Sequence, residues 1–540
     1  MRWLLPSVGD LLFVAILGVL VFTNLSVRLL GDAGIGWHIR TGQIVLATHA
    51  IPRVDPFSSS MSGHPWFAWE WLYDVLVGWL ESLAGLNGVV LLTALIIAAV
   101  FSWVHRLLLA RGTNILVALI LVLIAVSASM IHFLARPHVV SWLFTVAWFW
   151  ILESSENGRS WMLWSLPLLM VVWVNVHGGF LLGFALLTLY WVTAGWQWLT
   201  LTLRLTEEGF DDFLRKLRTG RRFRVLTIVG ILSAAATLLN PYGFQLHGHI
   251  YRYLSNRFLM DHIDEFQSPN FHYVAQKCFA GLLLLTLVAL AAKGREFRRV
   301  SASHGLVVLF AVYSGLYASR NIPVSSLLLI LVMGPWLSDA IALLAESQRT
   351  SKQTSLASTG FLSRMDGIEL SLRGHVWPIV AIALTCWIVI HGGNFGATQL
   401  IDAHFDSKRF PVAAVSYLEK QDVQGPVLSP DSWGGYLIYR LNLYPNHPNP
   451  IEPHHSESRM KIVVDDRHDL YGEEFLKSYL KMIHVQPGWD QFLEQHQTQC
   501  VLVPKDSALA SILLETSDWK AIYGDDVAVA FIRTLAPLSH

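Results

Sequence analysis

Long runs of apolar residues alternate with short polar segments over the first three quarters of the chain. A helix needs about 20 mostly apolar residues to cross the hydrocarbon core of a bilayer. On that criterion the pattern predicts about eleven membrane-spanning helices. The predicted spans are residues 10–29, 86–104, 114–133, 139–153, 161–176, 180–203, 225–242, 277–292, 305–319, 322–344 and 375–393.

One stretch between the first two spans has a different pattern. Residues 69–84, WEWLYDVLVGWLESLA, are amphipathic and acidic. A helix of this kind buries one face at the boundary between lipid and water. We therefore expect residues 69–84 to lie along the membrane surface, inside a first outer loop that covers residues 31–85.

The last part of the chain, residues 395–540, has the pattern of a soluble domain that follows a transmembrane domain of residues 1–394. Strand-like runs (GPVLSP, KIVVDD, QCVLVP and VAVAFIR) alternate there with helix-like runs (GEEFLKSYLKMI and SALASILLET). This alternation predicts a small α/β domain. Glycine, proline and asparagine predict turns at DSWGGYL and PNHPNPIEPHH.

Composition supports a polytopic α-helical membrane protein. Of the 540 residues, 53% are hydrophobic and 14% are charged, whereas soluble domains have about 25% charged residues. The mean hydropathy is +0.46. The 22 tryptophans are typical of aromatic belts at bilayer surfaces. The formal net charge of zero gives no indication of nucleic-acid binding.

Basic residues predict the orientation, because cytoplasmic loops are enriched in lysine and arginine. With the N-terminus inside, the inner loops include RKLRTGRRFR (215–224) and KGREFRR (293–299). The odd number of spans then places the C-terminal domain outside. We expect a multi-pass protein of the bacterial inner membrane with a periplasmic C-terminal domain.

Polar and ionisable residues gather at the helix ends that this orientation places outside. GDAGIGWH follows the first span, and the other segments are ARPH (135–138), NVHGG (175–179), NPYGFQLHGH (240–249) and SRN (319–321). Charged groups at this depth are costly unless they face a cavity or one another. One water-filled cavity would accommodate all five segments, although polar turns at helix ends also have an ordinary structural explanation.

Arg136 and Arg320 are directly joined to apolar helices, beside a proline and an Asn-Ile-Pro break. A guanidinium group offers paired donors that match a phosphate. We expect these arginines to bind an anion, and the alternative is contact with lipid headgroups.

The first outer loop contains the strongest catalytic candidate, Asp32, in the sequence GDAG at the expected mouth of the cavity. The loop also interleaves acids with aromatic rings, a combination that suits sugars because carboxylates accept hydrogen bonds from hydroxyl groups and flat rings pack on sugar faces. Alternatives are a turn at Asp55, the polar face of the interfacial helix for Glu70, and membrane anchoring for the tryptophans. The residues expected to contact substrate are His38, Asp55, His64, Trp66, Glu70, Asn175 and Tyr242.

An ordered set of short motifs covers nearly the whole chain and resembles the polytopic glycosyltransferases of the GT-C fold, in particular uncharacterised bacterial members. The motifs are GDAGIGWHIRTGQ, DPFS, WFAWEWL, ARPH, WVNVHGGF, LNPYG, SRN, WGGYL and VVDDRHDLYG. The order of the motifs is more specific than any one of them. The resemblance implies a polyprenyl-phosphate sugar as donor.

The resemblance implies that Asp32 matches the first-loop aspartate of this family, which acts as a catalytic base or contacts a metal. Many members have a second acid beside that aspartate, whereas this chain has Ala33. A second acid for a divalent metal, Mg or Mn, would have to come from Asp55, Glu70 or DHIDE (261–265).

The resemblance also leads to a mechanism, in which Asp32 takes the proton of an acceptor hydroxyl as it attacks the anomeric carbon. Arg136 and Arg320 are the first candidates to hold the leaving lipid phosphate, with Arg257 and His177 as second choices. The acceptor could be a glycan, a lipid or a protein. A lipid or polysaccharide translocator, or an anchor or sensor acting through its outer domain, are the alternatives. For VVDDRHDLYG (463–472) we favour a salt-bridged turn at the end of a strand over a ligand site.

Overall fold

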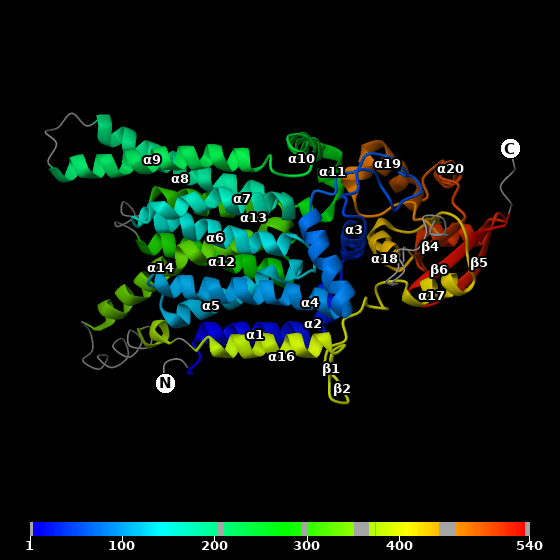
Figure 1. Cartoon of the computed structure of the whole chain (residues 1–540), viewed down its shortest axis with the longest axis horizontal. Coiled ribbons are helices and arrows are strands. Elements are labelled where there is room, and N and C mark those ends of the chain that lie inside the picture. Colours follow the sequence, from blue (N-terminus) through cyan, green and yellow to red (C-terminus); the bar gives the residue numbers. More distant parts are fainter. Residues whose placement is uncertain are drawn as a thin grey trace.

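The computed structural model describes residues 4–203, 210–293, 301–349, 367–372, 374–441 and 460–534. Figure 1 shows a helical bundle joined at one end to a smaller domain formed by the C-terminal part of the chain. Several helices and loops lie across the junction between the two parts. The residues predicted to form the site lie mainly at this junction.

The helices of the bundle form where the sequence has its apolar runs, and each predicted span contains a helix. Within the described residues, five helical stretches are long and apolar enough to cross a membrane, namely Trp71–Ala110, Ile115–His132, Gly178–Leu203, Val274–Lys293 and Ser319–Leu344. The chain is therefore a multi-pass membrane protein, and the number of spans stays a prediction. The bundle helices are α1 (Val8–Phe22), α2 (Leu25–Leu29), α4 (Trp71–Ala110), α5 (Ile115–Ser129), α6 (His138–Glu156), α7 (Leu166–Val176), α8 (Leu181–Leu203), α9 (Phe210–Ala236), α12 (Val274–Lys293), α13 (Ala302–Tyr317), α14 (Ile322–Arg349) and α16 (Val376–Ile390).

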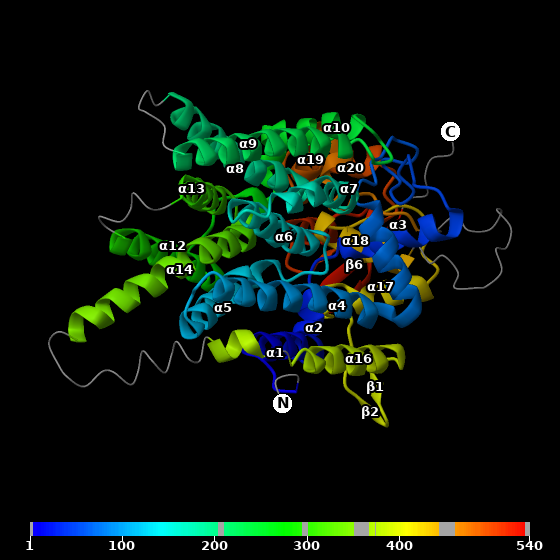
Figure 2. The ribbon, with the colours of Figure 1, turned by 60° about the vertical axis from the view of Figure 1, so that its left-hand side comes forward.

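The arrangement within the bundle is clearest when it is turned. In Figure 2, α8 and α9 lie at one side of the bundle, and α1 and α16 lie at the other. Helix α1 begins at the end of the bundle opposite the C-terminal domain (Figure 1). The two ends of the bundle therefore differ, since only one of them contacts the C-terminal domain.

The helix α4 consists of two helices joined by a kink. Ala84 and Gly85 have non-helical backbone angles, and Gly85 has a φ of 61°, which glycine adopts without steric cost. The kink separates the amphipathic residues 71–83 from the apolar residues 86–110. Its position agrees with the predicted boundary between the interfacial helix and the next span.

The first outer loop contains a second helix that was not predicted from the sequence. Residues of the GDAGIGWHIRTGQ motif form α3 (Ile35–Thr48), which packs along the amphipathic part of α4. The two backbones touch, because a Cβ atom at Gly42 would lie only 1.8 Å from the carbonyl oxygen of Asp74. Shorter helices α10 (Gln245–Ser255) and α11 (Arg257–His262) lie at the same end of the bundle.

The C-terminal domain is an α/β domain, as predicted. Its four-stranded sheet has the order β3-β4-β6-β5, in which β3 and β4 are parallel and the other pairs are antiparallel. A separate hairpin of β1 (Asn394–Phe395) and β2 (Thr398–Gln399) precedes it. The elements of the domain are α17 (Val412–Lys420), β3 (Val427–Leu428), α18 (Asp431–Leu441), α19 (His468–Ile483), α20 (Trp489–Gln495), β4 (Cys500–Pro504), α21 (Ala508–Glu515), β5 (Trp519–Gly524) and β6 (Ala528–Arg533).

Two local predictions differ from the structure. DSWGGYL forms the start of α18 rather than a turn, because its glycines permit close packing: a Cβ atom at Gly435 would lie 2.2 Å from the carbonyl oxygen of Ala33. KIVVDD forms only single β-bridges at Ile462 instead of a strand, and β5 was not predicted. The predicted turn PNHPNPIEPHH lies outside the described residues.

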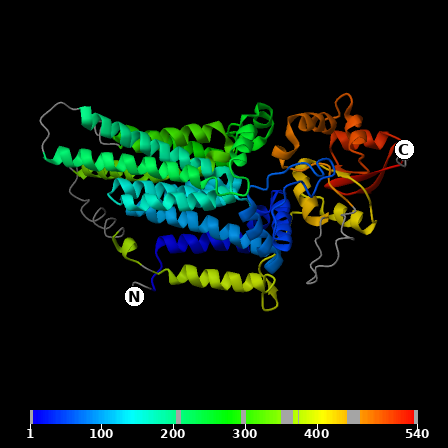
Figure 3. The ribbon, with the colours of Figure 1, turned by 45° about the horizontal axis from the view of Figure 1, so that its top comes forward.

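The part of the first outer loop between α3 and α4 packs against the C-terminal domain (Figure 3). Ser58 forms a parallel bridge with Ile462, and Ile462 forms another with Val427 of β3. The amide of Ser59 donates to the carbonyl of Ile462 at 2.8 Å. The loop therefore extends the edge of the domain, although about 400 residues separate the two segments in sequence.

Candidate active site at the junction of the two domains

Three side chains from distant parts of the chain meet at the junction. Arg136 lies just before α6, and its Nη1 atom donates to Oδ2 of Asp32 at 2.8 Å. Its Nη2 atom donates to Oδ2 of Asp466 at 3.1 Å, and Trp37 of α3 donates to the other oxygen of Asp466 at 3.0 Å. The guanidinium group thus bridges two carboxylates, which is the geometry its planar fork favours.

The local backbone positions Asp32. Asp32 lies in the turn between α2 and α3, and its Oδ1 atom accepts a hydrogen bond from the amide of Gly34 at 2.8 Å. Its side chain is 28% exposed, so this carboxylate remains accessible from solvent. Close packing extends to Gly34, where a Cβ atom would lie 2.5 Å from Oδ2 of Asp466.

Burial and charge act in opposite directions in this cluster. Burial raises the pKa of Asp466, Arg136 lowers it and Asp32 raises it, and the result is a pKa above the usual value. Burial lowers the pKa of Arg136, but the two carboxylates outweigh burial and raise it, so this guanidinium stays charged.

A second group lies around Glu70, at the start of α4. Nε2 of His38 lies 3.8 Å from Oε2 of Glu70, and Nε2 of His177 lies 3.7 Å from Oε1. His38 comes from α3, and His177 lies between α7 and α8. Burial is the largest influence on Glu70 and raises its pKa to about 8. Glu70 is therefore largely protonated at neutral pH.

The two imidazoles near Glu70 are fixed by contacts at their Nδ1 atoms, on the ring side away from Glu70. Nδ1 of His38 lies 2.6 Å from Oδ1 of Asp74, and the side chain of His38 is completely buried. Nδ1 of His177 accepts from the amide of Gly179 at 3.0 Å and lies 2.8 Å from Oγ of Ser141. Burial is the largest factor that lowers the pKa of both histidines, so both rings are neutral at pH 7.

Arg320 lies in the same region with its own acidic partner. Its Nη1 atom is 3.3 Å from Oε1 of Glu265, and its guanidinium lies 4.4 Å from the ring centre of Phe266. Burial raises the pKa of Glu265, but Arg320 and Arg136 outweigh burial and lower it to about 2. Glu265 is therefore ionised, and the DHIDE segment does reach this end of the bundle.

Two cavities adjoin these groups. The first has a volume of about 380 Å³ and a mostly apolar lining that includes Trp71, Leu72, Val172 and Leu239. Val172 and Leu239 are 42% and 64% exposed on the outside of the bundle. The second cavity has a volume of about 430 Å³, and aromatic and polar side chains line it. They include Trp66, Phe67, His249, Arg252, Tyr253 and Asp469.

Asp55 and Trp66 lie in a buried cluster beside this site. Nη1 of Arg467 donates to Oδ1 of Asp55 at 2.8 Å, and Nη2 donates to Oδ2 of Asp465 at 2.7 Å. The guanidinium also lies 4.7 Å from the ring centre of Trp66. Because the Arg467 and Asp55 side chains are at most 1% exposed, this cluster joins the first loop to the C-terminal domain.

The remaining predicted residues belong neither to the group of Asp32, Arg136 and Asp466 nor to the group around Glu70. The amide oxygen of Asn175 accepts from Nε1 of Trp71 at 2.7 Å, and the hydroxyl of Tyr242 accepts from the amide of Ala68 at 2.8 Å. His64 is exposed. Arg257 is 93% exposed at its side chain and pairs with Asp261 at 3.8 Å.

The contact of Asp466 with Arg136 was not predicted from the sequence, whereas Glu265 belongs to the segment DHIDE (261–265), which was a candidate source of a second acid. The motif VVDDRHDLYG was noted, and the preference for a salt-bridged turn agrees with the Asp465–Arg467 pair. Asp466, the next residue, points instead to Arg136. Two adjacent acids after an apolar run are the signal that could have identified it, because only one of two neighbouring side chains can easily turn into the domain.

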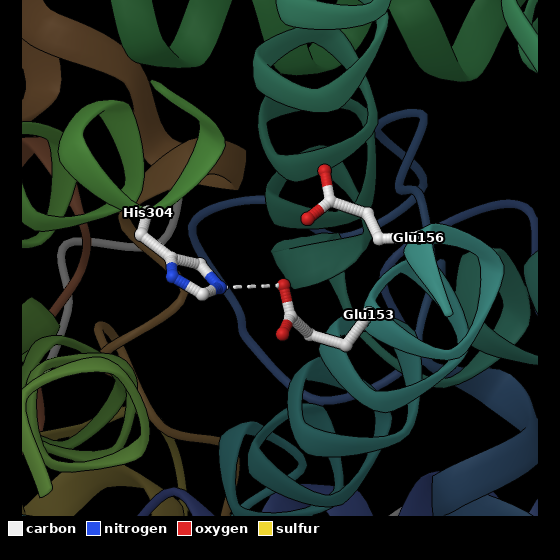
Figure 4. A group of neighbouring side chains, drawn as sticks. All are labelled: Glu153, Glu156 and His304. Carbon is white, nitrogen blue, oxygen red and sulfur yellow. Dashed lines mark hydrogen bonds and ion pairs between the residues drawn. The ribbon is translucent and has the colours of Figure 1, made fainter. Parts of the chain in front are cut away.

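The structure also bears on a divalent metal. Within the part of the chain that is described, Glu153, Glu156 and His304 form a group that could hold an ion (Figure 4). Glu153 already pairs with Arg111 and with Nε2 of His304 at 2.9 Å, and Glu156 pairs with Arg222 at 2.9 Å. A metal would lie beside two guanidinium groups, so an ion-pair network fits these residues better.

The same test applies at Asp32. The carboxylates of Asp32 and Asp466 share the guanidinium of Arg136, which takes the place that a cation would need between them. The Glu153 group does not substitute for it, because the C-terminal end of α6 lies at the opposite end of the bundle (Figure 1). We therefore derive no step through a metal.

The fold is that of the GT-C membrane glycosyltransferases. The chain is similar to the crystal structure of the oligosaccharyltransferase of Archaeoglobus fulgidus in the apo form, with a TM-score of 0.54 and 11% identity over 92% of this chain and 69% of that chain. It is also similar to the same enzyme tethered to an acceptor peptide containing the NVT sequon, with a TM-score of 0.55 and 12% identity over 98% and 74% of the two chains. No family model and no curated protein matches the sequence.

Proposed function

We propose that this protein is a membrane glycosyltransferase that moves a sugar from a polyprenyl-phosphate donor to an acceptor on the outer face of the membrane. The observation that supports this most directly is the group of Asp32, Arg136 and Asp466 at the junction of a GT-C fold. An accessible carboxylate beside a half-buried, charged guanidinium suits an attack by a hydroxyl group on a sugar linked to phosphate.

In this proposal Asp32 is the catalytic base. It takes the proton of the acceptor hydroxyl as the oxygen attacks the anomeric carbon, and help of this kind accelerates a reaction by about 10²–10⁴. Arg136 orients Asp32 through the 2.8 Å contact between its Nη1 atom and Oδ2 of the carboxylate. The leaving phosphate is held by the remaining donors of Arg136 and by Arg320.

The apolar cavity would hold the part of the lipid nearest the phosphate. Its lining residue Trp71 directly follows Glu70, and Asn175 lies two residues before His177. The exposed sides of Val172 and Leu239 face the outside of the bundle, so a polyprenyl chain could enter from the bilayer. A lipid in this cavity would therefore place its headgroup beside the ionisable groups of the site.

The second cavity suits the acceptor. Phe67 and Tyr253 offer aromatic rings, and Asp469 and Arg252 offer polar groups, a combination that binds glycans or extended peptides. A structural relative has been solved with a tethered acceptor peptide. For this chain a glycan, a lipid headgroup and a peptide all remain acceptor candidates.

Sidedness follows from the charge distribution. The basic segments 215–224 and 293–299 belong inside by the positive-inside rule. We therefore place the N-terminus in the cytoplasm and the C-terminal domain in the periplasm of a bacterial cell. Nucleotide sugars are absent from that side, which agrees with a lipid-linked donor.

The test is sugar release from a panel of labelled polyprenyl-phosphate sugars, with membrane extract as acceptor, by purified wild type, Asp32→Asn and Asp402→Asn. Asp402 is an exposed aspartate outside the site and serves as the matched control. We expect turnover by wild type and the control and a loss of at least about 100-fold in Asp32→Asn. Full turnover by Asp32→Asn would refute Asp32 as the base. No turnover by wild type with any donor would favour translocation or anchoring.

A further inference from the structure

The side chains of Glu70, His38 and His177 face a space that their own contacts do not fill. The Nε2 atoms of His38 and His177 lie 3.8 and 3.7 Å from the carboxyl oxygens of Glu70, which is too far for a direct hydrogen bond. Nε2 of His38 is buried and has no hydrogen-bond partner. Buried polar atoms are rarely left without a partner, so another polar atom belongs in this space.

The space lies where the proposed lipid donor has its phosphate. Nε1 of Trp71 donates to the side chain of Asn175 at 2.7 Å, and both residues line the apolar cavity. Trp71 directly follows Glu70, and Asn175 lies two residues before His177, so this wall of the cavity leads to the Glu70 group. Glu70 also lies within the electrostatic influence of Arg136 and Arg320. A phosphate oxygen at the end of a lipid in the cavity would thus meet Glu70 on one side and the two arginines on the other.

We propose that Glu70 is the proton donor to the leaving phosphate oxygen of the lipid-linked donor, in a subsite lined by His38 and His177. This proposal rests on the proposed function. The bond between the anomeric carbon and the phosphate oxygen breaks, and its electron pair stays on that oxygen. The carboxyl proton of Glu70 moves to the same oxygen.

The remaining steps balance the reaction. The acceptor oxygen forms the new bond to the anomeric carbon and loses its proton to Asp32. Asp32 then releases that proton to water, and Glu70 takes one from water. Both residues return to their starting states, and the products are the glycosylated acceptor and the lipid phosphate with one added proton.

The protonated form of Glu70 results from its surroundings. Burial raises its pKa most, Arg136 and Arg320 lower it, and Asp469 and Glu265 raise it, so that the pKa is about 8. A proton donor works best when its pKa lies near the working pH. Two histidines and an acid come from the nearest elements: His38 on α3, His177 after α7 and Asp74 on α4. The arginines are Arg136 before α6 and Arg320 in the helical turn Ser319–Asn321. The other acids are Glu265 in the helical turn Asp264–Phe266 and Asp469 on α19.

The first test needs no substrate. Infrared titration of the full-length protein measures the carbonyl band of protonated carboxyl groups in wild type, Glu70→Gln and Glu81→Gln. Glu81 lies further along α4 and contacts Tyr439 and Gln43, outside the subsite. We expect a component of this band that disappears near pH 8 in wild type and in Glu81→Gln and is missing in Glu70→Gln. All three proteins keep the contribution of Asp466, whose pKa is also raised by burial. A Glu70 that is ionised already at pH 6 would overturn the proposal.

The second test uses the polyprenyl-phosphate sugar that wild type turns over. The rate of transfer by wild type should fall as pH rises through about 8. Glu70→Gln should be slower by about 10²–10⁴ at pH 7 and should lack this decline, whereas Glu81→Gln should behave like wild type. An active wild type with an equally active Glu70→Gln would refute only the role of Glu70. Absence of turnover in wild type with every donor would refute the proposed function and this role together.

Discussion

Replacement of Arg467 by methionine tests how the first outer loop is attached to the C-terminal domain. The guanidinium of Arg467 contacts Asp55 of the loop at 2.8 Å and Asp465 of the domain at 2.7 Å. It also donates from Nε to Asp465 at 2.8 Å. Methionine keeps much of the apolar contact with Trp66 but removes all of these charge-assisted hydrogen bonds.

The expected cost is large because the two carboxylates stay buried without their cation. Asp55 would keep hydrogen bonds from the amides of Phe57 and Ser58, and Asp465 would keep the hydroxyl of Tyr471. Removal of one partner of a buried ion pair costs about 3–5 kcal/mol. The free energy required to open the loop locally should fall by the same amount.

Hydrogen exchange of the detergent-solubilised protein measures this opening directly. Backbone amides at residues 54–60 and 462–467 should exchange roughly 100- to 4,000-fold faster in Arg467→Met, since each 1.4 kcal/mol is a factor of ten. Arg440→Met is the matched control, because Arg440 pairs with Glu419 at the surface and such pairs contribute about 0–1 kcal/mol. Equal exchange in the two variants would refute the view that this ion cluster holds the loop.

Three further changes test other parts of the structure. Gly36→Ala should lower the melting temperature, because its Cβ atom would lie 2.1 Å from the carbonyl oxygen of Gly435; a rise, as expected from helix propensity alone, would contradict the close packing. The folded protein binds the Glu70 proton more tightly than the unfolded chain does. The stability that proton binding at Glu70 contributes is therefore complete below about pH 4.5 and is lost as pH rises through about 8. In denaturant titrations the free energy of unfolding should depend less on pH in Glu70→Gln than in wild type, and an equal dependence would count against the raised pKa. Glu153→Gln should destabilise the protein by about 3 kcal/mol, because Arg111 loses a buried charged partner; an unchanged thermal unfolding curve would argue against the ion-pair network.

The apolar pattern predicted the fold well because membrane helices leave a strong and local signal. The kink at Gly85 falls where the amphipathic residues give way to the continuous apolar run. The α/β character of the C-terminal domain followed from alternating strand and helix signals. Each of these signals comes from residues that are close together in the sequence, so a single sequence is enough to detect it.

The helices α3 and α18 could not be predicted in the same way. Both contain glycines, and glycine disfavours an isolated helix. In the structure the glycines permit contact between the two helices, because Gly36 and Gly435 bring their backbones together. The local sequence pattern shows that glycine disfavours a helix. It does not show the neighbouring helix whose close approach requires glycine.

The candidate site was predicted only in part for a related reason. Asp32, Arg136 and Arg320 stood out because charged residues beside apolar helices are rare. Asp466 did not, since acids are common in soluble domains, and its role depends on a contact with Arg136 across 330 positions of sequence. Asp55 looked like a loop residue that could bind sugar, yet it is buried against Arg467.

The long separation between Arg136 and Asp466 has a consequence during synthesis. The ribosome adds about 5–20 residues per second, so the 330 positions between these two residues take roughly 15–65 s to make. During that time Asp32 and Arg136 are already in the chain, but the edge at Ile462 and the second carboxylate do not yet exist. A nascent or prematurely terminated chain therefore contains Asp32 and Arg136 without Asp466. The junction is complete only when the C-terminal domain has folded against the first outer loop.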